Sequence, residues 1–160
     1  MIKSIITDLS KVLLFPLDES YTGKLNDLHE TKLKTDDYDF WKIFKMNEEL
    51  LHFYRKLSRK VDIYIFTTRY IQEYPPLKQK LDSTFSKVFS SDQLGIEKAD
   101  SKSYTKLAQM IHKEPDQILF VDDRPLNIEA AKKAGLITYQ YDSNGNFFDY
   151  LIESRLIQSE

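Results

Sequence analysis

The sequence predicts an α/β fold with a five-stranded, mainly parallel central sheet, on two observations. Short apolar runs recur along the chain, and segments of helical periodicity lie between them. Strands that alternate with helices are typical of right-handed βαβ units, which place the strands in parallel. The five runs are residues 2–7, 63–66, 87–89, 118–121 and 137–141.

The apolar runs favour strands because most of their residues are β-branched or aromatic and polar residues bound them. Runs 63–66 and 118–121 have little polar interruption, which is expected of strands covered on both faces. Run 137–141 begins shortly after Gly135, a residue type that commonly ends a helix.

Four segments predict helices. Asn47 can cap a helix that continues to about residue 58 and carries an apolar stripe. Residues 101–112 show the same spacing of apolar positions, and residues 146–156 close the chain. Residues 125–134 begin with proline and are followed by glycine, the usual asymmetry of helix ends.

We expect one domain over residues 1–160, because no repeat or low-complexity linker interrupts the alternation. Residues 14–46 differ from the rest, being polar and without a clear period until the aromatic stretch 38–44. We interpret 14–46 as a short cap or flap insertion with a short helix at its end. Its aromatic residues are expected to pack into the core.

Composition excludes several classes of function. The chain has 23 basic and 25 acidic residues, so no overall field attracts nucleic acid or an anionic membrane. It contains no cysteine, which excludes disulfides, thiolate catalysis and cysteine-bound zinc. The first residues do not form a signal peptide, and no apolar run approaches the roughly 20 residues of a membrane span. We therefore expect a soluble cytoplasmic protein.

Polar residues at the ends of the predicted strands indicate the site. Asp8, Thr67 and the pair Asp122–Asp123 each close a strand, and ligands of open α/β sheets bind at that edge. Carboxylates such as Asp8 and Asp123 suit Mg²⁺, which binds substrate phosphate. Asp8 could then attack phosphorus and form an aspartyl phosphate, while Thr67 and Lys98 contact the phosphoryl oxygens.

Four segments in order resemble the four motifs of the haloacid dehalogenase superfamily over nearly the whole chain. The third and fourth are together the most specific. The segments are Ile5-Ile6-Thr7-Asp8-Leu9-Ser10-Lys11-Val12-Leu13, Ile63-Tyr64-Ile65-Phe66-Thr67-Thr68, Gly95-Ile96-Glu97-Lys98-Ala99-Asp100, and Phe120-Val121-Asp122-Asp123-Arg124-Pro125-Leu126-Asn127.

The resemblance implies a Rossmann-like three-layer core with the first strand central, and a phosphatase or phosphotransferase that depends on Mg²⁺. It implies Asp8 as nucleophile, with Thr67, Thr68 and Lys98 binding phosphate. The implied metal ligands are Asp8, Asp123 and the backbone carbonyl of Ser10, supported by Asp122, and Asn127 lies where many members have another acid.

The sequence departs from the family at Ser10, which replaces the aspartate that protonates the leaving oxygen and later activates water. A serine hydroxyl cannot act as a carboxylic acid near neutral pH, so poor leaving groups should be hydrolysed slowest and aryl and acyl phosphates should be least affected. Lys11, His29 or a carboxylate such as Asp36 could replace the acid. A Schiff-base lysine of the phosphonate-cleaving type is a weaker option, with candidates Lys24, Lys32 and Lys34.

The cap is truncated relative to the family, which implies an open site, a larger substrate or a lid from a second copy of the chain. The substrate would be a phosphorylated small molecule or macromolecule. A second hypothesis is a weakened family member that binds a phosphorylated partner or acts as a scaffold. A receiver domain is disfavoured because its acidic pair comes early, whereas Asp122–Asp123 comes late.

Arg69 and Arg124 each follow a motif residue, and either could contact phosphate or substrate. The histidines His29, His52 and His112 lack metal-ligand spacing, and we do not expect them to bind metal.

Overall fold

A five-stranded parallel sheet forms the centre of the molecule, which a computed structural model describes over residues 1–157. The strand order is β5-β4-β1-β6-β7, so the first strand is central. This confirms the predicted fold class and all five predicted strands. The strands are β1 (Ser4–Thr7), β4 (Asp62–Thr67), β5 (Lys87–Ser90), β6 (Ile118–Asp122) and β7 (Ile137–Gln140).

The register of the sheet places the end of β1 between β4 and β6, both of which continue past it, β4 to Thr67 and β6 to Asp122. Thr7 lies opposite Ile65 on one side and Val121 on the other. The residues of β6 are all buried, and within run 63–66 of β4 only Tyr64 is partly exposed, which explains why these two runs show little polar interruption. The residue after Thr7 therefore emerges between the ends of β4 and β6.

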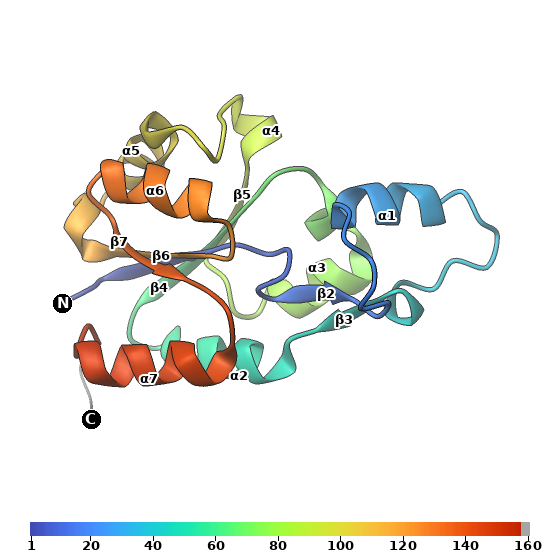
Figure 1. The fold of residues 1–160 in the computed structure, drawn as a ribbon, viewed down its shortest axis with the longest axis horizontal. Helices are drawn as coiled ribbons and strands as arrows, with labels where there is room; N and C mark the ends of the chain where they lie inside the picture. Colours follow the sequence, from blue (N-terminus) through green and yellow to red (C-terminus); the bar gives the residue numbers. More distant parts are fainter. Residues whose placement is uncertain (158–160) are drawn as a thin grey trace.

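Helices cover both faces of the sheet and produce three layers, as Figure 1 shows. On one face Ile6, Phe66 and Phe120 pack against α5 (Ser101–Met110) and α6 (Pro125–Lys133). On the other face Ile5, Ile63 and Leu119 pack against α2 (Glu48–Leu57) and α7 (Asn144–Ser154).

The helix ends follow the predicted signals. The side chain of Asn47 accepts a hydrogen bond from the Leu50 N–H at 3.2 Å and caps α2. Gly135 follows α6 with φ 91°, a left-handed conformation that glycine adopts without strain. α7 begins two residues earlier than predicted, at Asn144. Two short helices, α3 (Pro75–Leu81) and α4 (Ser91–Leu94), were not predicted.

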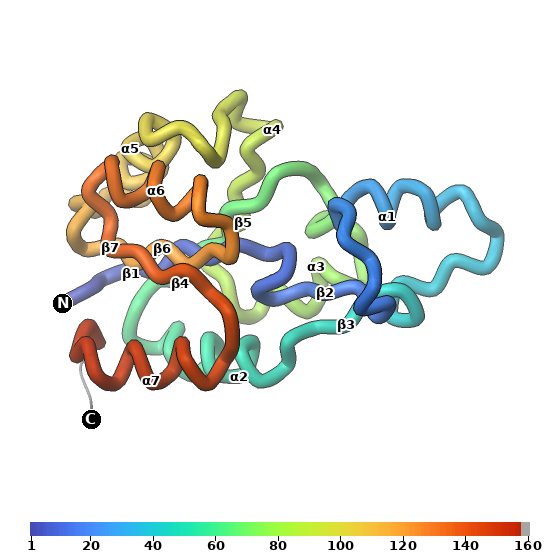
Figure 2. The backbone as a smooth tube through the Cα atoms, viewed as in Figure 1, coloured from blue at the N-terminus to red at the C-terminus, as the bar shows by residue number. Residues whose placement is uncertain are grey.

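The predicted insertion is bounded by a two-stranded hairpin that the sequence did not predict. β2 (Leu14–Pro16) and β3 (Phe44–Met46) pair antiparallel, with Leu14 opposite Met46. Residues 17–43, called the cap segment below, extend beyond one end of the sheet (Figure 2). The segment contains α1 (Leu25–Lys32) and a 3-10 turn (Phe40–Lys42), the latter matching the predicted short helix.

The aromatic residues of the insertion form a small core of their own, which joins the main core. Phe40 and Phe44 are almost fully buried, as the sequence predicts for this stretch. His29 lies edge-on against Tyr74 with ring centroids 4.8 Å apart, and its Nδ1 is 2.7 Å from the Tyr38 hydroxyl. His29 is therefore a packed residue of the cap.

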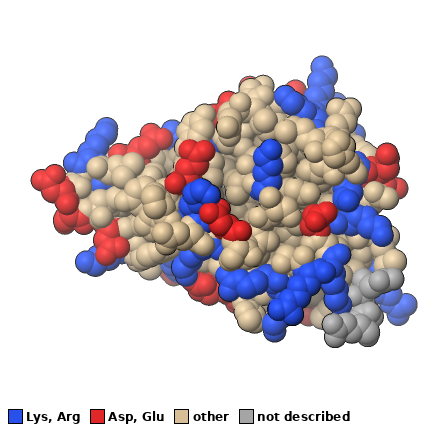
Figure 3. Space-filling model, turned by 180° about the vertical axis from the view of Figure 1, so that it is seen from behind, with Lys and Arg blue, Asp and Glu red and all other residues tan. Residues whose placement is uncertain are grey.

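The surface carries charges of both signs. Figure 3 shows basic and acidic side chains interspersed over one face, with more basic groups along the lower edge, where α2 lies. The basic residues at the end of that helix include Arg55 and Lys56. Within residues 1–157, each helix is too short or too polar to cross a bilayer.

Candidate active site

Asp8 lies directly after β1, between the carboxyl ends of β4 and β6. Its N–H donates a hydrogen bond to the carbonyl of Val121 at 2.8 Å, so the backbone of Asp8 still belongs to the sheet. The side chain is 6% exposed, and its Oδ1 accepts a hydrogen bond from the Leu9 N–H at 2.8 Å. The carboxylate is thus fixed by both its own strand and the turn that follows.

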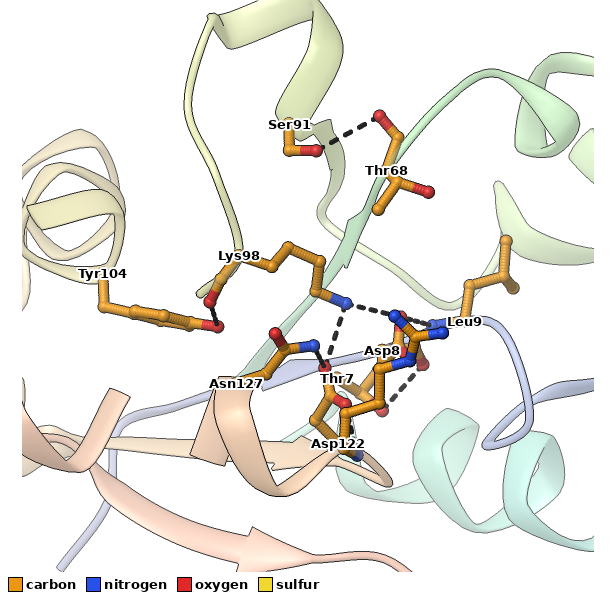
Figure 4. A network of polar contacts seen from close by, with 10 residues as sticks. Thr7, Asp8, Leu9, Thr68, Ser91, Lys98, Tyr104, Asp122 and Asn127 are labelled. Carbon is orange, nitrogen blue, oxygen red and sulfur yellow. Dashed lines mark hydrogen bonds and ion pairs between the residues drawn. The ribbon is translucent and has the colours of Figure 1, made fainter. Parts of the chain in front are cut away.

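Lys98 connects two carboxylates in the interior. Its Nζ is 2.7 Å from Oδ1 of Asp8 and 3.0 Å from Oδ2 of Asp122, and all three side chains are almost fully buried (Figure 4). The Tyr104 hydroxyl donates to the Lys98 carbonyl at 2.6 Å. Lys98 is therefore held both at its ammonium group and at its backbone carbonyl.

Asp122 accepts hydrogen bonds on both of its oxygens. Oδ1 accepts from the Arg124 N–H at 2.8 Å, and Oδ2 accepts from the Asn127 side-chain amide at 3.0 Å in addition to Lys98. Its exposed fraction is 0%. Asp122 therefore lies beneath the pocket, where it holds Lys98, Asn127 and the Arg124 N–H in place, while Asp8 and Asp123 line the open pocket.

The electrostatics of the cluster leave an excess of negative charge. Burial is the main cause that raises the pKa of Asp8 to about 7; Lys98 opposes this rise, and the charge of Asp122 contributes to it. Burial and the neighbouring Asp122 also raise the pKa of Asp123. For Lys98, burial favours the neutral amine, but the two carboxylates outweigh burial and raise its pKa. Three acids share one ammonium group, which is an environment that stabilises a bound cation.

The donor set fits a hard divalent cation. One carboxylate oxygen from each of Asp8, Asp122 and Asp123 lies within 4.8 Å of the others. Carboxylate oxygen is the ligand type that Mg²⁺ prefers in proteins. Asp122 already has protein donors on both oxygens, so Asp8 and Asp123 are the better placed of the three.

A pocket of about 410 Å³ opens above this cluster and brings the predicted phosphate-binding residues to it. Thr67 is buried at the end of β4, and Thr68 follows it, with its carbonyl accepting from the Ser90 hydroxyl at 3.0 Å. The residues that line the pocket are Asp8, Ser10, Lys11, Gly23, Lys24, Leu25, Asp27, Thr67, Thr68, Arg69, Asp92, Lys98, Asp123, Arg124 and Asn127.

The two candidate arginines lie in different settings. Arg69 forms ion pairs with Asp27 and, at 3.3 Å, with Glu30, so its charge is used to hold α1 of the cap segment. Arg124 lines the pocket beside Asp123 and opposes the rise in the pKa of that carboxyl.

Sequence reasoning missed the contacts that support the site. Tyr104 belongs to the apolar stripe of α5, and nothing in the sequence separates its hydroxyl contact with Lys98 from ordinary packing. Asn26 accepts hydrogen bonds from the N–H groups of Tyr70 and Ile71, which fixes α1 against the loop after Thr68. Asp27 and Asp92 are further pocket residues without a sequence signal.

Fold and site together define an α/β protein whose sheet carries a buried Asp–Lys–Asp cluster at its carboxyl edge. The model of the haloacid dehalogenase-like hydrolase family matches residues 13–135, and the chain belongs to that family. The matched residues include Thr67, Lys98, Asp122 and Asp123 and begin after Asp8 and Ser10.

Curated relatives cover a smaller part of the chain. Enolase-phosphatase E1 of Caenorhabditis elegans is 32% identical over 93 residues, which are 56% of this chain and 37% of that protein. The Drosophila virilis enolase-phosphatase E1 is 41% identical over 49 residues, 31% of this chain and 20% of that protein. The chain therefore aligns with only about a fifth to a third of the length of these relatives.

Solved structures share the fold over almost the whole chain. A predicted HAD-like family hydrolase from Porphyromonas gingivalis has a TM-score of 0.70 and 21% identity, covering 99% of this chain and 100% of that one. A HAD family enzyme from Bacteroides thetaiotaomicron, crystallised with magnesium and inorganic phosphate, has a TM-score of 0.68 and 16% identity, covering 92% and 100%.

Proposed function

We propose that this chain is a Mg²⁺-dependent phosphatase or phosphotransferase that acts through an aspartyl phosphate on Asp8, with Ser10 in place of the usual acid/base aspartate. The observation that carries this proposal is the buried Lys98 bridging Asp8 and Asp122 at the floor of a polar pocket. Isolated charges are costly to bury, so such a cluster favours a role in binding or chemistry over a purely structural one.

The geometry at Asp8 supports its role as nucleophile. Oδ1 is held by Lys98 at 2.7 Å and by the Leu9 N–H at 2.8 Å. Among residues 1–157, Oδ2 receives no hydrogen bond and is the oxygen available to attack phosphorus. Attack in line with the leaving oxygen transfers the phosphoryl group to Asp8, and water then hydrolyses the acyl phosphate.

The carboxylates would hold the metal. Asp8, Asp123 and the carbonyl of Ser10 would bind Mg²⁺, with Asp122 supporting them. When bound, the ion neutralises charge on the carboxylates and on the transferring phosphoryl group. Its charge also favours the ionised form of Asp8, whose pKa burial otherwise raises to about 7.

Thr67, Thr68 and Lys98 would bind the phosphoryl oxygens. All three line the pocket that Asp8 shares, and hydroxyl and ammonium groups donate hydrogen bonds to phosphate. The relatives named enolase-phosphatase, and the structural neighbour crystallised with magnesium and inorganic phosphate, support a phosphorylated substrate.

The test is hydrolysis of p-nitrophenyl phosphate with Mg²⁺ and with EDTA. An aryl leaving group departs without much help from an acid, so the assay does not depend on Ser10. We expect Mg²⁺-dependent turnover that Asp8→Asn abolishes and that Asp116→Asn, the same change at an exposed position outside the pocket, leaves intact. Turnover that persists in Asp8→Asn would contradict the aspartyl-phosphate mechanism.

A second candidate function is suggested by Ser10, because a site without its acid/base residue can bind phosphate without turning it over. In that case the chain binds a phosphorylated partner or acts as a scaffold. Tight binding of inorganic phosphate with Mg²⁺, together with no aryl phosphate turnover over hours, would support this function over the first.

A further inference from the structure

The replacement of an acid by Ser10 leaves the oxygen of the leaving group without an obvious partner. Of the three residues that the sequence offers as substitutes, His29 is packed among aromatic rings and hydrogen-bonded to Tyr38. Neither His29 nor Asp36 lines the pocket, whereas Lys11 does, together with Asp8 and Ser10. Of the other carboxylates in the pocket, Asp27 is ion-paired with Arg69 and Asp92 is exposed, so the structure selects Lys11.

Lys11 has a backbone conformation that is uncommon for a residue with a side chain. Its φ is 61°, in the left-handed region that favours glycine. The turn that imposes this conformation is tightly bonded, because the Leu9 carbonyl accepts from the N–H groups of Leu13 and Leu14, both at 2.9 Å. Such conformations persist where the surrounding structure fixes them, and they concentrate at functional sites.

The turn is also fixed from outside. The Asn47 side chain donates to the Val12 carbonyl at 3.0 Å, and the Asn47 N–H donates to the Leu13 carbonyl at 2.7 Å. The N–H of Lys11 itself donates a hydrogen bond to the Leu14 carbonyl at 2.8 Å. The base of the Lys11 side chain is therefore held in place relative to Asp8, which starts the same turn.

The charge of Lys11 is available to a ligand. Within residues 1–157 its ammonium group has no carboxylate partner, whereas Lys98 and Arg69 are both ion-paired. The other two pocket cations are less suited to this role. Lys24 is exposed on the cap segment, and the charge of Arg124 acts on Asp123, on the metal-binding side of the pocket.

We propose that the Lys11 ammonium group contacts the leaving-group oxygen of a bound phosphate ester and stabilises the negative charge that develops there. This inference rests on the proposed phosphatase function. As the Asp8 oxygen forms its bond to phosphorus, the P–O bond to the leaving group breaks and its electron pair stays on the departing oxygen. That oxygen takes a proton from water after it has left, so the step needs no carboxylic acid.

The role assigned to Lys11 defines a substrate class. A cation lowers the energy of a departing anion but does not neutralise a strongly basic alkoxide as a carboxylic acid does. The site is therefore suited to phosphates whose leaving oxygen is weakly basic, namely aryl, enol and acyl phosphates. Simple alkyl phosphates would be turned over slowly.

The experiment measures kcat/KM for p-nitrophenyl, p-chlorophenyl, phenyl and methyl phosphates, in order of increasing basicity of the leaving oxygen. It compares the wild type with Lys11→Gln, Lys11→Arg and Lys24→Gln. For Lys11→Gln we expect a loss that grows along the series, from a few-fold for p-nitrophenyl phosphate to about 100-fold for phenyl phosphate. Lys11→Arg should retain most of the activity, because it keeps the charge.

Lys24→Gln is the matched control, since it removes from the same pocket a second ammonium group that has no carboxylate partner within residues 1–157. It should change kcat/KM by one common factor across the series. Lys11→Gly also removes the charge, and glycine adopts the left-handed backbone conformation of this position without strain. It therefore tests the same proposal with a variant that is expected to fold, should Lys11→Gln misfold. Lys11→Gln and Lys11→Gly should show the same steeper dependence on the leaving group, whereas Lys11→Arg should not.

Two failures are distinguishable. If the wild type is active and depends on Asp8, but kcat/KM of Lys11→Gln and Lys11→Gly falls by the same factor on every substrate, the role assigned to Lys11 is wrong and the proposed function stands. If the wild type has no Mg²⁺-dependent turnover on any substrate, the proposed function is wrong and the inference fails with it.

Discussion

At the carboxyl edge of the sheet, Asp8, Lys98 and Asp122 are joined by contacts of 2.7 and 3.0 Å between almost fully buried side chains. The cap segment is held differently, by the partly exposed ion pairs of Arg69, by Asn26 and by a small aromatic core. Buried charge networks lose much when one member is removed, whereas exposed pairs lose little. Changes at the sheet edge should therefore affect the whole molecule, and changes in the cap should stay local.

The largest expected effect is that of Lys98→Ala. The change leaves Asp8 and Asp122 buried side by side without a counter-charge, and we expect a loss of about 3–5 kcal/mol in the free energy of unfolding. Urea denaturation without metal measures it. Lys78→Ala, which removes an exposed pair with Asp82 at 2.7 Å, is the matched control and should cost less than about 1 kcal/mol. Equal losses in the two variants would contradict the comparison.

Next in size is the kinetic effect of Ser10→Asp at the sheet edge. Restoring a carboxylic acid should raise kcat/KM for alkyl phosphates by about 10- to 100-fold and leave kcat/KM for p-nitrophenyl phosphate nearly unchanged, because kcat/KM reports the departure of the leaving group and an acid helps poor leaving groups most. Steady-state assays with Mg²⁺ on both substrates test this. A clear fall on both would mean that the serine hydroxyl has a specific role of its own.

In the cap segment, Asn26→Ala should cost more than Arg69→Gln. Asn26 is 4% exposed and accepts hydrogen bonds from two backbone N–H groups, whose loss should cost about 1–3 kcal/mol. The ion pairs of Arg69 involve partners that are each 56% exposed and should contribute less than about 1 kcal/mol. Hydrogen exchange of the α1 amides measures both effects. Faster exchange throughout the central sheet would show that the cap is not independent.

The smallest expected effect is a dependence of cap stability on pH. Burial lowers the pKa of His29 below its ordinary value of 6.5, although Glu30 opposes the shift. The unfolded chain then binds a proton more readily than the folded one, so the stabilisation is complete above pH 6.5 and declines as the pH falls toward the lower pKa of the folded state. Exchange of α1 amides at pH 7.5 and 5.5 should show this. The change should diminish in His29→Gln, and an unaltered change there would assign it to another group.

The sequence predicted the regions in which one physical signal dominates. The runs 63–66 of β4 and 118–121 of β6 are continuous and apolar because helices bury both faces, so they are visible without a structure. β2 and β3 have three residues each, which is too short for any period to be detected. α1 was missed because few of its eight residues are buried, and two of those are the polar residues Asn26 and His29.

In the candidate site, too, the residues marked by a local sequence signal were predicted, and the contacts that depend on the tertiary fold were not. Asp8, Thr67 and Lys98 were predicted because strand ends and motif spacing mark them, and the structure brings all three to one pocket. The pairing of Arg69 with Asp27, 42 positions apart, depends on how the cap folds back, which local patterns do not encode. The choice of Lys11 over His29 and Asp36 likewise required the positions of the turn after β1, of α1 and of the segment that follows α1.

The hairpin that bounds the insertion has an evolutionary consequence. Because Pro16 and Phe44 pair across β2 and β3, the two ends of residues 17–43 leave the core side by side. The entropy of closing a loop between fixed ends grows slowly, by about 0.6 kcal/mol for each doubling in length. Segments of very different size could therefore be exchanged at this junction without disturbing Asp8, so that new substrate preferences can arise by replacing one module while the chemistry beneath it is inherited unchanged.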